Sequence, residues 1–198
     1  MKLSNYLVDL VLSGVLIVGA YQFYFWCQRN ALFEPRELAS KLDDLIPYAP
    51  QWVWVYSFLY YPAILYVNLT LTSAEQFTWV AASYLLLLAL QVAFFVLFPV
   101  KTPHQWRVAA VRQGLSEKFL AFVQKFDAPT NSFPSMHTSV AMLTALHLSG
   151  ALGPAAFAFP LLIGLSCLFT KQHYLIDLPA GAALGWVTYS LYGALIAA

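Results

Sequence analysis

Two short polar segments contain the side chains in this sequence that are best suited to chemistry. The first runs from Asn131 to Ser139 (NSFPSMHTS), and the second runs from Lys171 to Asp177 (KQHYLID). Each segment holds one histidine, and each lies at the edge of a long apolar run. A reaction that uses both histidines requires the two segments to meet, so the elements between them decide whether a site forms.

The second segment places a histidine and a carboxylate at helical spacing. His173 and Asp177 are four residues apart, so their side chains share one face if a helix begins this early. A carboxylate one turn away can accept a hydrogen bond from one ring nitrogen, which fixes the tautomer and leaves the other nitrogen free as a base or nucleophile. The structural alternative is that His173 is an interfacial polar residue and Asp177 a helix cap.

Several groups in and near the first segment are suited to binding an anion. Asn131 and Ser135 lie at or before the start of an apolar run, where the first N–H groups of a helix have no partner and can bind phosphate. Lys101, Arg107 and Lys171 supply positive charge in the polar segments nearby. The structural alternatives are that Ser135 caps a helix and that Lys101 and Arg107 are ordinary positive loop residues.

The composition indicates the surroundings in which these residues act. Of 198 residues, 61% are hydrophobic and 10% are charged, whereas soluble domains carry about 25% charged residues. We therefore expect a membrane protein with a single integral membrane domain over residues 1–198. A net charge of +1 without a basic run argues against nucleic acid as a partner. Cys27 and Cys167 are too few for a metal cage or a disulfide framework, so we expect both to be packing residues.

The apolar runs predict an all-α fold, a six-span transmembrane helix bundle. Helices of about 20 residues are needed to cross a bilayer. The expected spans are residues 6–26, 52–71, 77–98, 135–149, 154–170 and 178–197. Apolar residues recur at helical spacing within 34–46 and 117–126, which predicts short interfacial helices in the loops after spans one and three.

Alternate crossing brings the two histidine segments to one end of such a bundle. Six spans place the loops after spans one, three and five on the same side, and the turn at 150–154 makes spans four and five a hairpin. His137 at the start of span four and His173 just after span five then lie at the same end. His147 follows ten residues after His137, about 15 Å along the helix, so we interpret it as an interfacial or packing residue.

At these residues the sequence resembles the type 2 phosphatidic acid phosphatase superfamily, six-span membrane enzymes related to vanadium haloperoxidases. The family motif Pro-Ser-Gly-His is matched by Pro134-Ser-Met-His137, with Met136 in the glycine place. His173 and Asp177 match the His-x-x-x-Asp of the third family motif. The flanking NSFP and TKQHY sequences are similar to the branch that contains inositol phosphorylceramide synthases. The resemblance covers residues 45–195.

The sequence departs from the family pattern at two places. In the third motif Ser166 holds the serine place, but Cys167 stands where the family has an arginine, and we hypothesise that Lys171 replaces that cation. In the first motif Lys101 and Arg107 are separated by five residues instead of six, and no Arg-Pro follows. His104, which lies between them, is a further candidate for the place of either.

The resemblance implies a mechanism with a covalent intermediate. His173 would attack phosphorus to form a phosphohistidine, Asp177 would orient its ring, and His137 would protonate the departing lipid oxygen. The groups expected to offset the charge on the phosphate oxygens are Ser135, Lys101, Arg107 and Lys171. Further possible site residues are His104, Asp127, Asn131 and Ser166. We expect no metal ion or other cofactor, because Asp127 and Asp177 are too few and too scattered for a two-metal site.

These expectations favour a metal-independent membrane lipid phosphatase acting on a phospholipid or polyprenyl phosphate. The nearest alternative is a lipid phosphotransferase, in which a lipid alcohol such as a sphingolipid base or an inositol-type acceptor takes the place of water. An alternative of another class is a non-catalytic lipid-binding membrane protein, in which the changes at Cys167 and in the first motif have removed activity.

Two arguments about the membrane side of the motifs disagree. Nine lysines and arginines lie in the loops on the side of the two histidine segments (the motif side), and only Lys2 lies on the other side. The positive-inside rule then predicts a cytoplasmic site. The basic residues counted on the motif side are Arg29, Arg36, Lys41, Lys101, Arg107, Arg112, Lys118, Lys125 and Lys171. The resemblance instead implies an extracytoplasmic site in a bacterial inner membrane or an endomembrane. Both sides stay open at this point.

Overall fold

The computed structural model describes residues 3–108 and 114–197, and this part of the chain is 76% helical. Arg112, which the charge count included, lies outside the described residues. The elements in order are α1 (Leu3–Cys27), α2 (Lys41–Leu45), η1 (Pro50–Trp52), α3 (Val53–Phe58), α4 (Tyr60–Thr70), α5 (Ala74–Leu97), α6 (Gln105–Val108), α7 (Leu115–Phe126), α8 (Met136–Leu152), η2 (Gly153–Phe157), α9 (Ala158–Phe169) and α10 (Asp177–Ala197). No strand occurs in the described ranges, so the all-α prediction is confirmed.

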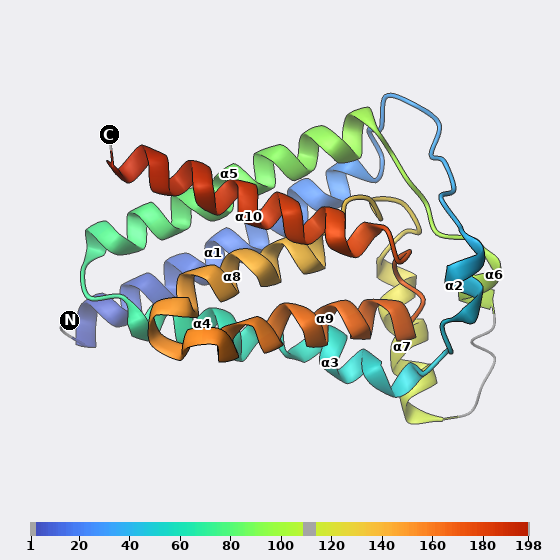
Figure 1. The fold of residues 1–198 in the computed structure, drawn as a ribbon, viewed down its shortest axis with the longest axis horizontal. Coiled ribbons are helices and arrows are strands. Elements are labelled where there is room, and N and C mark those ends of the chain that lie inside the picture. The colour runs from blue at the N-terminus through green and yellow to red at the C-terminus, as the bar shows by residue number, and fades with distance from the viewer. Residues whose placement is uncertain (1–2, 109–113, 198) are drawn as a thin grey trace.

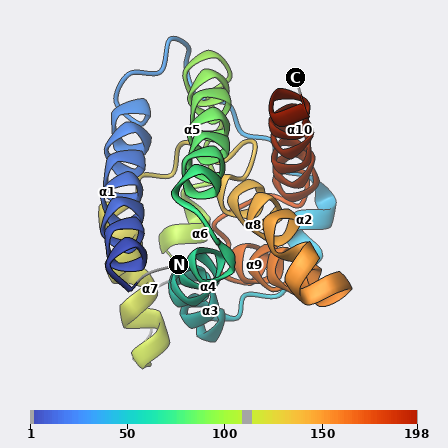
Figure 2. The same ribbon diagram turned by 90° about the vertical axis from the view of Figure 1, so that its left-hand side faces the viewer.

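Helix α8 lies in the middle of the bundle. It contacts α4, α5, α9 and α10, and Figure 2 shows these helices around it. It begins after Ser135, whose hydroxyl accepts a hydrogen bond from the N–H of Thr138, and it ends at Gly153, which has a φ of 57°. Both ends follow from residue type, because serine is a favoured N-cap and glycine adopts positive φ without steric cost.

Two glycines allow α8 and α10 to cross closely. A Cβ atom at Gly181 would lie 2.4 Å from the carbonyl oxygen of Ser135, and one at Gly185 would lie 2.4 Å from that of Ser139. Their spacing is the Gly-x-x-x-Gly pattern that lets membrane helices approach backbone to backbone. This crossing holds the start of α10, which carries Asp177, against the start of α8.

Four segments of the described chain are long and apolar enough to cross a membrane, which indicates an integral membrane protein. They are Tyr6–Cys27, Ala74–Leu97, Met136–Phe169 and Asp177–Ala197. Helix α1 presents most of its apolar side chains to the outside, among them Val11 and Val15, as expected of a helix that faces lipid.

The expected count of six spans is not supported. The run 52–71 is divided into α3 and α4, because Pro62 lacks an N–H and its ring crowds the carbonyl of Phe58, four residues before it. The runs 135–149 and 154–170 become α8 and α9, which have 17 and 12 residues, so α8 is at the lower limit of about 17 residues for a span and α9 is below it. Figure 1 shows that the chain reverses at η2, so α8 and α9 form a hairpin inside the single segment Met136–Phe169.

One end of the bundle collects most of the irregular chain. Helices α2, α6 and α7 gather there with the start of α8, the end of α9 and the start of α10, on the right of Figure 1. The interfacial helix expected within 34–46 is only five residues long, whereas α7 is close to the expected 117–126. Helix α7 packs through Leu120 and through Phe119, whose ring stacks on Trp54 at 4.7 Å.

Candidate active site

Two acceptors hold one ring nitrogen of His173. Its Nδ1 lies 2.9 Å from the carbonyl oxygen of Ser132 and 3.2 Å from Oδ2 of Asp177. The same carboxylate oxygen accepts a hydrogen bond from the N–H of Tyr174 at 2.9 Å, which fixes its position. Because both neighbours of Nδ1 are acceptors, Nδ1 carries the proton and Nε2 keeps a free lone pair. His173 can therefore act as a base or a nucleophile through Nε2.

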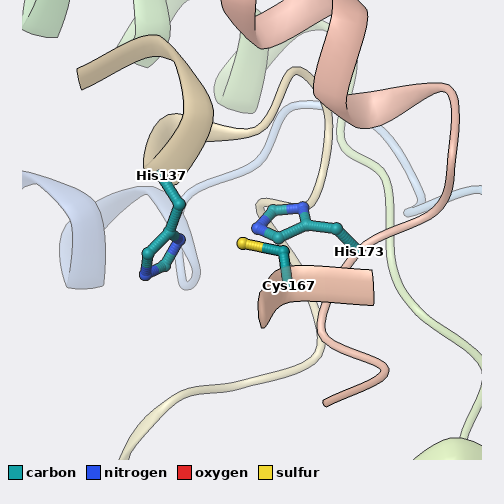
Figure 3. Close-up of side chains that lie close together, drawn as sticks. All are labelled: His137, Cys167 and His173. Atoms are coloured by element: carbon teal, nitrogen blue, oxygen red, sulfur yellow. The ribbon is translucent and has the colours of Figure 1, made fainter. Parts of the chain in front are cut away.

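The two histidine segments meet, as expected from the predicted hairpin of the runs 135–149 and 154–170. The ring centroids of His137 and His173 are 5.6 Å apart, and Figure 3 shows the two side chains facing one another across Cys167. The backbone joins the segments directly, because the N–H of Ser135 donates to the carbonyl oxygen of Asp177 at 3.0 Å. Each segment also contains a non-glycine residue with positive φ, Asn131 at 64° and Lys171 at 56°. Such conformations are costly and concentrate at functional sites.

The start of α8 offers hydrogen-bond donors beside His137. Helix α8 begins at Met136, so the N–H groups of Met136 and His137 have no acceptor within the helix. The Ser135 hydroxyl accepts from Thr138, which is the capping role that the sequence left as an alternative. Ser135 is fully buried, and a hydroxyl that accepts through a lone pair also has one hydrogen to donate.

Two tyrosines that the sequence did not single out hold His137. The ring of Tyr56 in α3 stacks on the imidazole with centroids 4.3 Å apart. Tyr60 in α4 donates a hydrogen bond from its hydroxyl to the backbone carbonyl of His137. The side chain of His137 remains half-buried, whereas His173 is 5% exposed and Asp177 is fully buried.

Two of the three cations expected at a phosphate are bound to protein carbonyls. Arg107 donates to the carbonyl oxygens of Asp127 and Ala128 after the end of α7, the second at 3.1 Å. Lys171 donates from Nζ to the carbonyl oxygen of Asp43 at 2.7 Å. Burial lowers the pKa of Lys171, although Asp43 and Asp44 act in the opposite direction. The hypothesis that Lys171 replaces the family arginine therefore receives no support from its contacts.

Lys101 lies beside the His173 loop, and His104 lies on the surface. The backbone oxygen of Lys101 accepts a hydrogen bond from the hydroxyl of Tyr174 at 2.7 Å, and Tyr174 directly follows His173 in the sequence. Its own side chain is half-buried. His104 is exposed in the turn before α6. The backbone of Lys101 is thus tied to the loop that carries His173.

The further candidates Asp127, Asn131 and Ser166 make structural contacts. Oδ1 of Asp127 accepts hydrogen bonds from the hydroxyl of Tyr24 and the amide of Gln28, each at 2.8 Å. Asn131 donates from its side chain to the carbonyl oxygen of Tyr24 at 2.9 Å. Ser166 donates to a carbonyl of its own helix at 2.7 Å. The first two residues thus tie the α7–α8 connection to α1.

Asp43 and Gln91, which were not among the predicted site residues, support the site. The carboxylate of Asp43 accepts from the N–H of Leu175 at 2.7 Å, which anchors the loop that carries His173. Gln91 in α5 donates to the carbonyl oxygen of Pro134 at 2.6 Å and accepts from the Ser139 hydroxyl at 3.1 Å. Gln91 could have been predicted from the sequence, because a polar residue inside a long apolar run usually marks a functional or supporting position.

Cys167 packs in the core as expected, but it also lies between the two histidines. It is fully buried in α9. Its sulfur and the ring nitrogens of His137 and His173 lie within 4.8 Å of one another. Figure 3 shows each histidine turning a ring nitrogen towards this sulfur. A cysteine at the place of the family arginine thus brings a third donor atom into the site.

His147 lies outside this group. Its Nε2 is 2.9 Å from the Ser83 hydroxyl in α5, and its ring contacts Tyr189 and Tyr192 of α10. These contacts agree with its interpretation as a packing residue.

Comparison with known proteins gives one family and one relative. Residues 34–191 match the family model described as the PAP2 superfamily. An uncharacterized protein of Methanocaldococcus jannaschii is 35% identical over 66 residues, which is 32% of this chain and 28% of the relative. The chain therefore spans about 28% of the length of that curated relative. No solved structure matches.

Proposed function

The chain belongs to the PAP2 superfamily, whose members are phosphoric ester hydrolases or phosphotransferases, and on this premise we propose that it hydrolyses a lipid phosphate ester in a membrane. The observation that carries the proposal is the pair of acceptors at Nδ1 of His173, the carbonyl of Ser132 and the carboxylate of Asp177. They leave Nε2 as an unprotonated nitrogen that faces His137. The substrate is a phospholipid or a polyprenyl phosphate.

In the first step Nε2 of His173 attacks phosphorus. A nitrogen–phosphorus bond forms, the bond from phosphorus to the lipid oxygen breaks, and His137 gives a proton to that oxygen, so that a lipid alcohol leaves. Asp177 stabilises the positive charge that develops on the imidazole. Stacking on Tyr56 holds the ring of His137 in place for the proton transfer.

In the second step His137 takes a proton from water while the water oxygen attacks phosphorus. The nitrogen–phosphorus bond breaks, inorganic phosphate leaves, and both histidines return to their starting states. The negative charge on the phosphate oxygens is offset by the N–H groups at the start of α8, by the Ser135 hydroxyl and by Lys101. Arg107 and Lys171, which donate to protein carbonyls, contribute their positive charge to the field of the site. No step of this cycle uses a metal ion.

A lipid phosphotransferase is the second candidate, because the same phosphohistidine can be attacked by a lipid alcohol instead of water. The NSFP and TKQHY sequences favour it through their similarity to the inositol phosphorylceramide synthase branch. The near-complete burial of His173 also favours it, since a buried nucleophile has limited access to bulk water. Labelled donor supplied with a lipid alcohol separates the two candidates by the product, which is inorganic phosphate in one case and a phosphomonoester of the added alcohol in the other.

The test of the proposal is phosphate release by the purified protein in detergent. Phosphatidic acid and a polyprenyl phosphate are supplied in separate assays with a chelator present, and the phosphoenzyme is trapped from labelled substrate. We expect turnover and an acid-labile phosphoenzyme, with both lost in His173→Ala. The matched control is His147→Gln, which changes a half-buried histidine outside the site and keeps a polar group opposite Ser83.

Equal phosphate release by His173→Ala and the original chain would refute the proposal. A folded protein that never forms a phosphoenzyme would instead support the non-catalytic lipid-binding alternative.

A further inference from the structure

The groups that surround His173 also form a set of metal ligands. In the described part of the chain, His137, Cys167 and His173 each offer one donor atom, and these atoms lie within 4.8 Å of one another. Imidazole and thiolate are the donors that Zn²⁺ prefers. Three protein ligands with an open fourth position are typical of zinc sites that exchange a bound molecule.

The contacts behind the donor atoms favour the same interpretation. Histidines that bind a metal usually donate their other ring N–H to a carboxylate or a backbone carbonyl, which fixes the ring and raises its basicity. His173 has both kinds of acceptor at Nδ1, from Asp177 and Ser132, so Nε2 is the nitrogen presented to a metal. His137 is fixed independently by Tyr56 and Tyr60.

The distances require only a small contraction. Bonds of about 2.3 Å to sulfur and about 2.0 Å to nitrogen place the donors of a tetrahedral zinc site roughly 3.5 Å apart. The donors here lie within 4.8 Å of one another, so movements of about 1 Å bring them into contact with one ion. Cys167 and His173 are almost fully buried, whereas His137 is half-buried and provides the side from which an ion reaches them.

We propose that His137, Cys167 and His173 bind Zn²⁺ and that the bound ion inhibits the enzyme. On binding, the Cys167 thiol and the protonated His137 ring each release a proton to solvent, and the sulfur and two ring nitrogens each donate a lone pair to the ion, without any change of oxidation state. The ion occupies the lone pair on Nε2 of His173 that attack on phosphorus requires. The binding claim stands on the geometry alone, whereas the inhibition claim rests on the proposed function.

Metal binding is tested directly with Co²⁺ as a spectroscopic substitute for Zn²⁺. The purified, chelator-treated protein is titrated with Co²⁺ in detergent, and the thiolate-to-cobalt charge-transfer absorption is recorded. We expect one equivalent of Co²⁺ to give this absorption and Zn²⁺ to displace it. The absorption disappears in Cys167→Ala and Cys167→Ser and persists in Cys27→Ala, which removes the other buried cysteine.

Inhibition is tested with the same variants and Zn²⁺, each compared with its own activity in chelator. Loss of an outer contact of a metal site typically weakens binding by about 10–100-fold, so loss of the sulfur ligand should raise the inhibitory Zn²⁺ concentration by more than about tenfold. Cys27→Ala should keep the inhibitory concentration of the original chain.

The outcomes separate the two claims. A protein without phosphate release that still shows the Co²⁺ absorption would refute the proposed function and leave the metal site in place. An active protein without the absorption, or one whose absorption survives Cys167→Ala and Cys167→Ser, would overturn the metal site. Equal Zn²⁺ inhibition of the original chain and both Cys167 variants would overturn inhibition through this site.

Discussion

The acceptors at Nδ1 of His173 determine which of its nitrogens reacts. Asp177 provides a carboxylate and Ser132 provides a carbonyl, so the N–H at Nδ1 has two partners. The carbonyl of Ser132 alone holds the tautomer when the carboxylate is neutralised, but the charge that stabilises the imidazolium is then lost.

Asp177→Asn should therefore lower kcat by about 100-fold, near the lower end of the range for an acid–base partner, and leave KM nearly unchanged. The measurement is steady-state phosphate release together with the rate at which phosphoenzyme forms in a single turnover. Activity within twofold of the original chain would show that Asp177 is only a helix cap.

Asp127 carries a buried carboxylate whose ionisation affects stability. Burial raises the pKa of Asp127 above its ordinary value of 3.8, although the hydrogen bond from Tyr24 and the charge of Arg107 act in the opposite direction. In the window between 3.8 and the raised pKa, the folded protein holds a proton that the unfolded chain has lost. Stability therefore falls as pH rises through this window.

Asp127→Asn should remove this dependence, because the amide stays neutral and its oxygen can still accept from Tyr24 and Gln28. The measurement is the thermal unfolding midpoint in detergent as pH is raised from about 4. The variant should give the flatter curve. A steeper fall in the variant would show that other groups carry the dependence.

The crossing of α8 and α10 is the element that joins the two halves of the site. Gly185 lies against the backbone of α8, where an added Cβ would meet Ser139 O at 2.4 Å and Met142 Cβ at 3.0 Å. An added methyl group must push the helices apart, and their separation would also pull Asp177 from Ser135.

Gly185→Ala should destabilise the protein by about 1–3 kcal/mol, the usual cost of overpacking. Gly193→Ala is the matched control in the same helix, since nothing lies within 4 Å of its added Cβ. Alanine has the higher helix propensity, so the control should be neutral or more stable by up to about 1 kcal/mol. Thermal unfolding of both variants measures the difference, and equal effects would contradict the close crossing.

The α8–α9 hairpin places its turn at the opposite end of the molecule from the two histidines. Figure 1 shows η2 on the left, and the site lies on the right between α8, α9 and α10. Both native cysteines are fully buried and should give little background labelling. An introduced cysteine therefore reports the side of the membrane on which its end of the bundle lies.

Lys118→Cys, at an exposed position in α7, and Ala155→Cys, at an exposed position in η2, should react with a membrane-impermeant maleimide from opposite sides. The measurement compares labelling of intact and opened vesicles. Labelling of both positions from the same side would contradict the hairpin as a membrane-crossing unit. The side on which Lys118→Cys reacts also decides between a cytoplasmic site, which the positive-inside rule predicts, and an extracytoplasmic site, which the resemblance implies.

Local pattern determined much of the fold in advance. Apolar runs of sufficient length predict helices regardless of their neighbours, and α1, α5 and α10 begin and end within three residues of the runs that predicted them. The shorter runs are not supported as separate spans, because a proline breaks one of them and the helix formed by another has only 12 residues. Pro62 was visible in the sequence, and so was the length of the run that became α9.

The sequence by itself determined the helical character, the two histidine segments and their meeting at one end of the bundle, because periodicity, motif and chain direction are properties of the chain alone. Only the tertiary structure decided what each polar side chain contacts. Arg107 and Lys171 donate to protein carbonyls, and Asp43 accepts from the loop that carries His173. Cys167 lies between the two histidines. A buried donor must find the nearest acceptor that packing provides, and that acceptor comes from segments far away in the sequence.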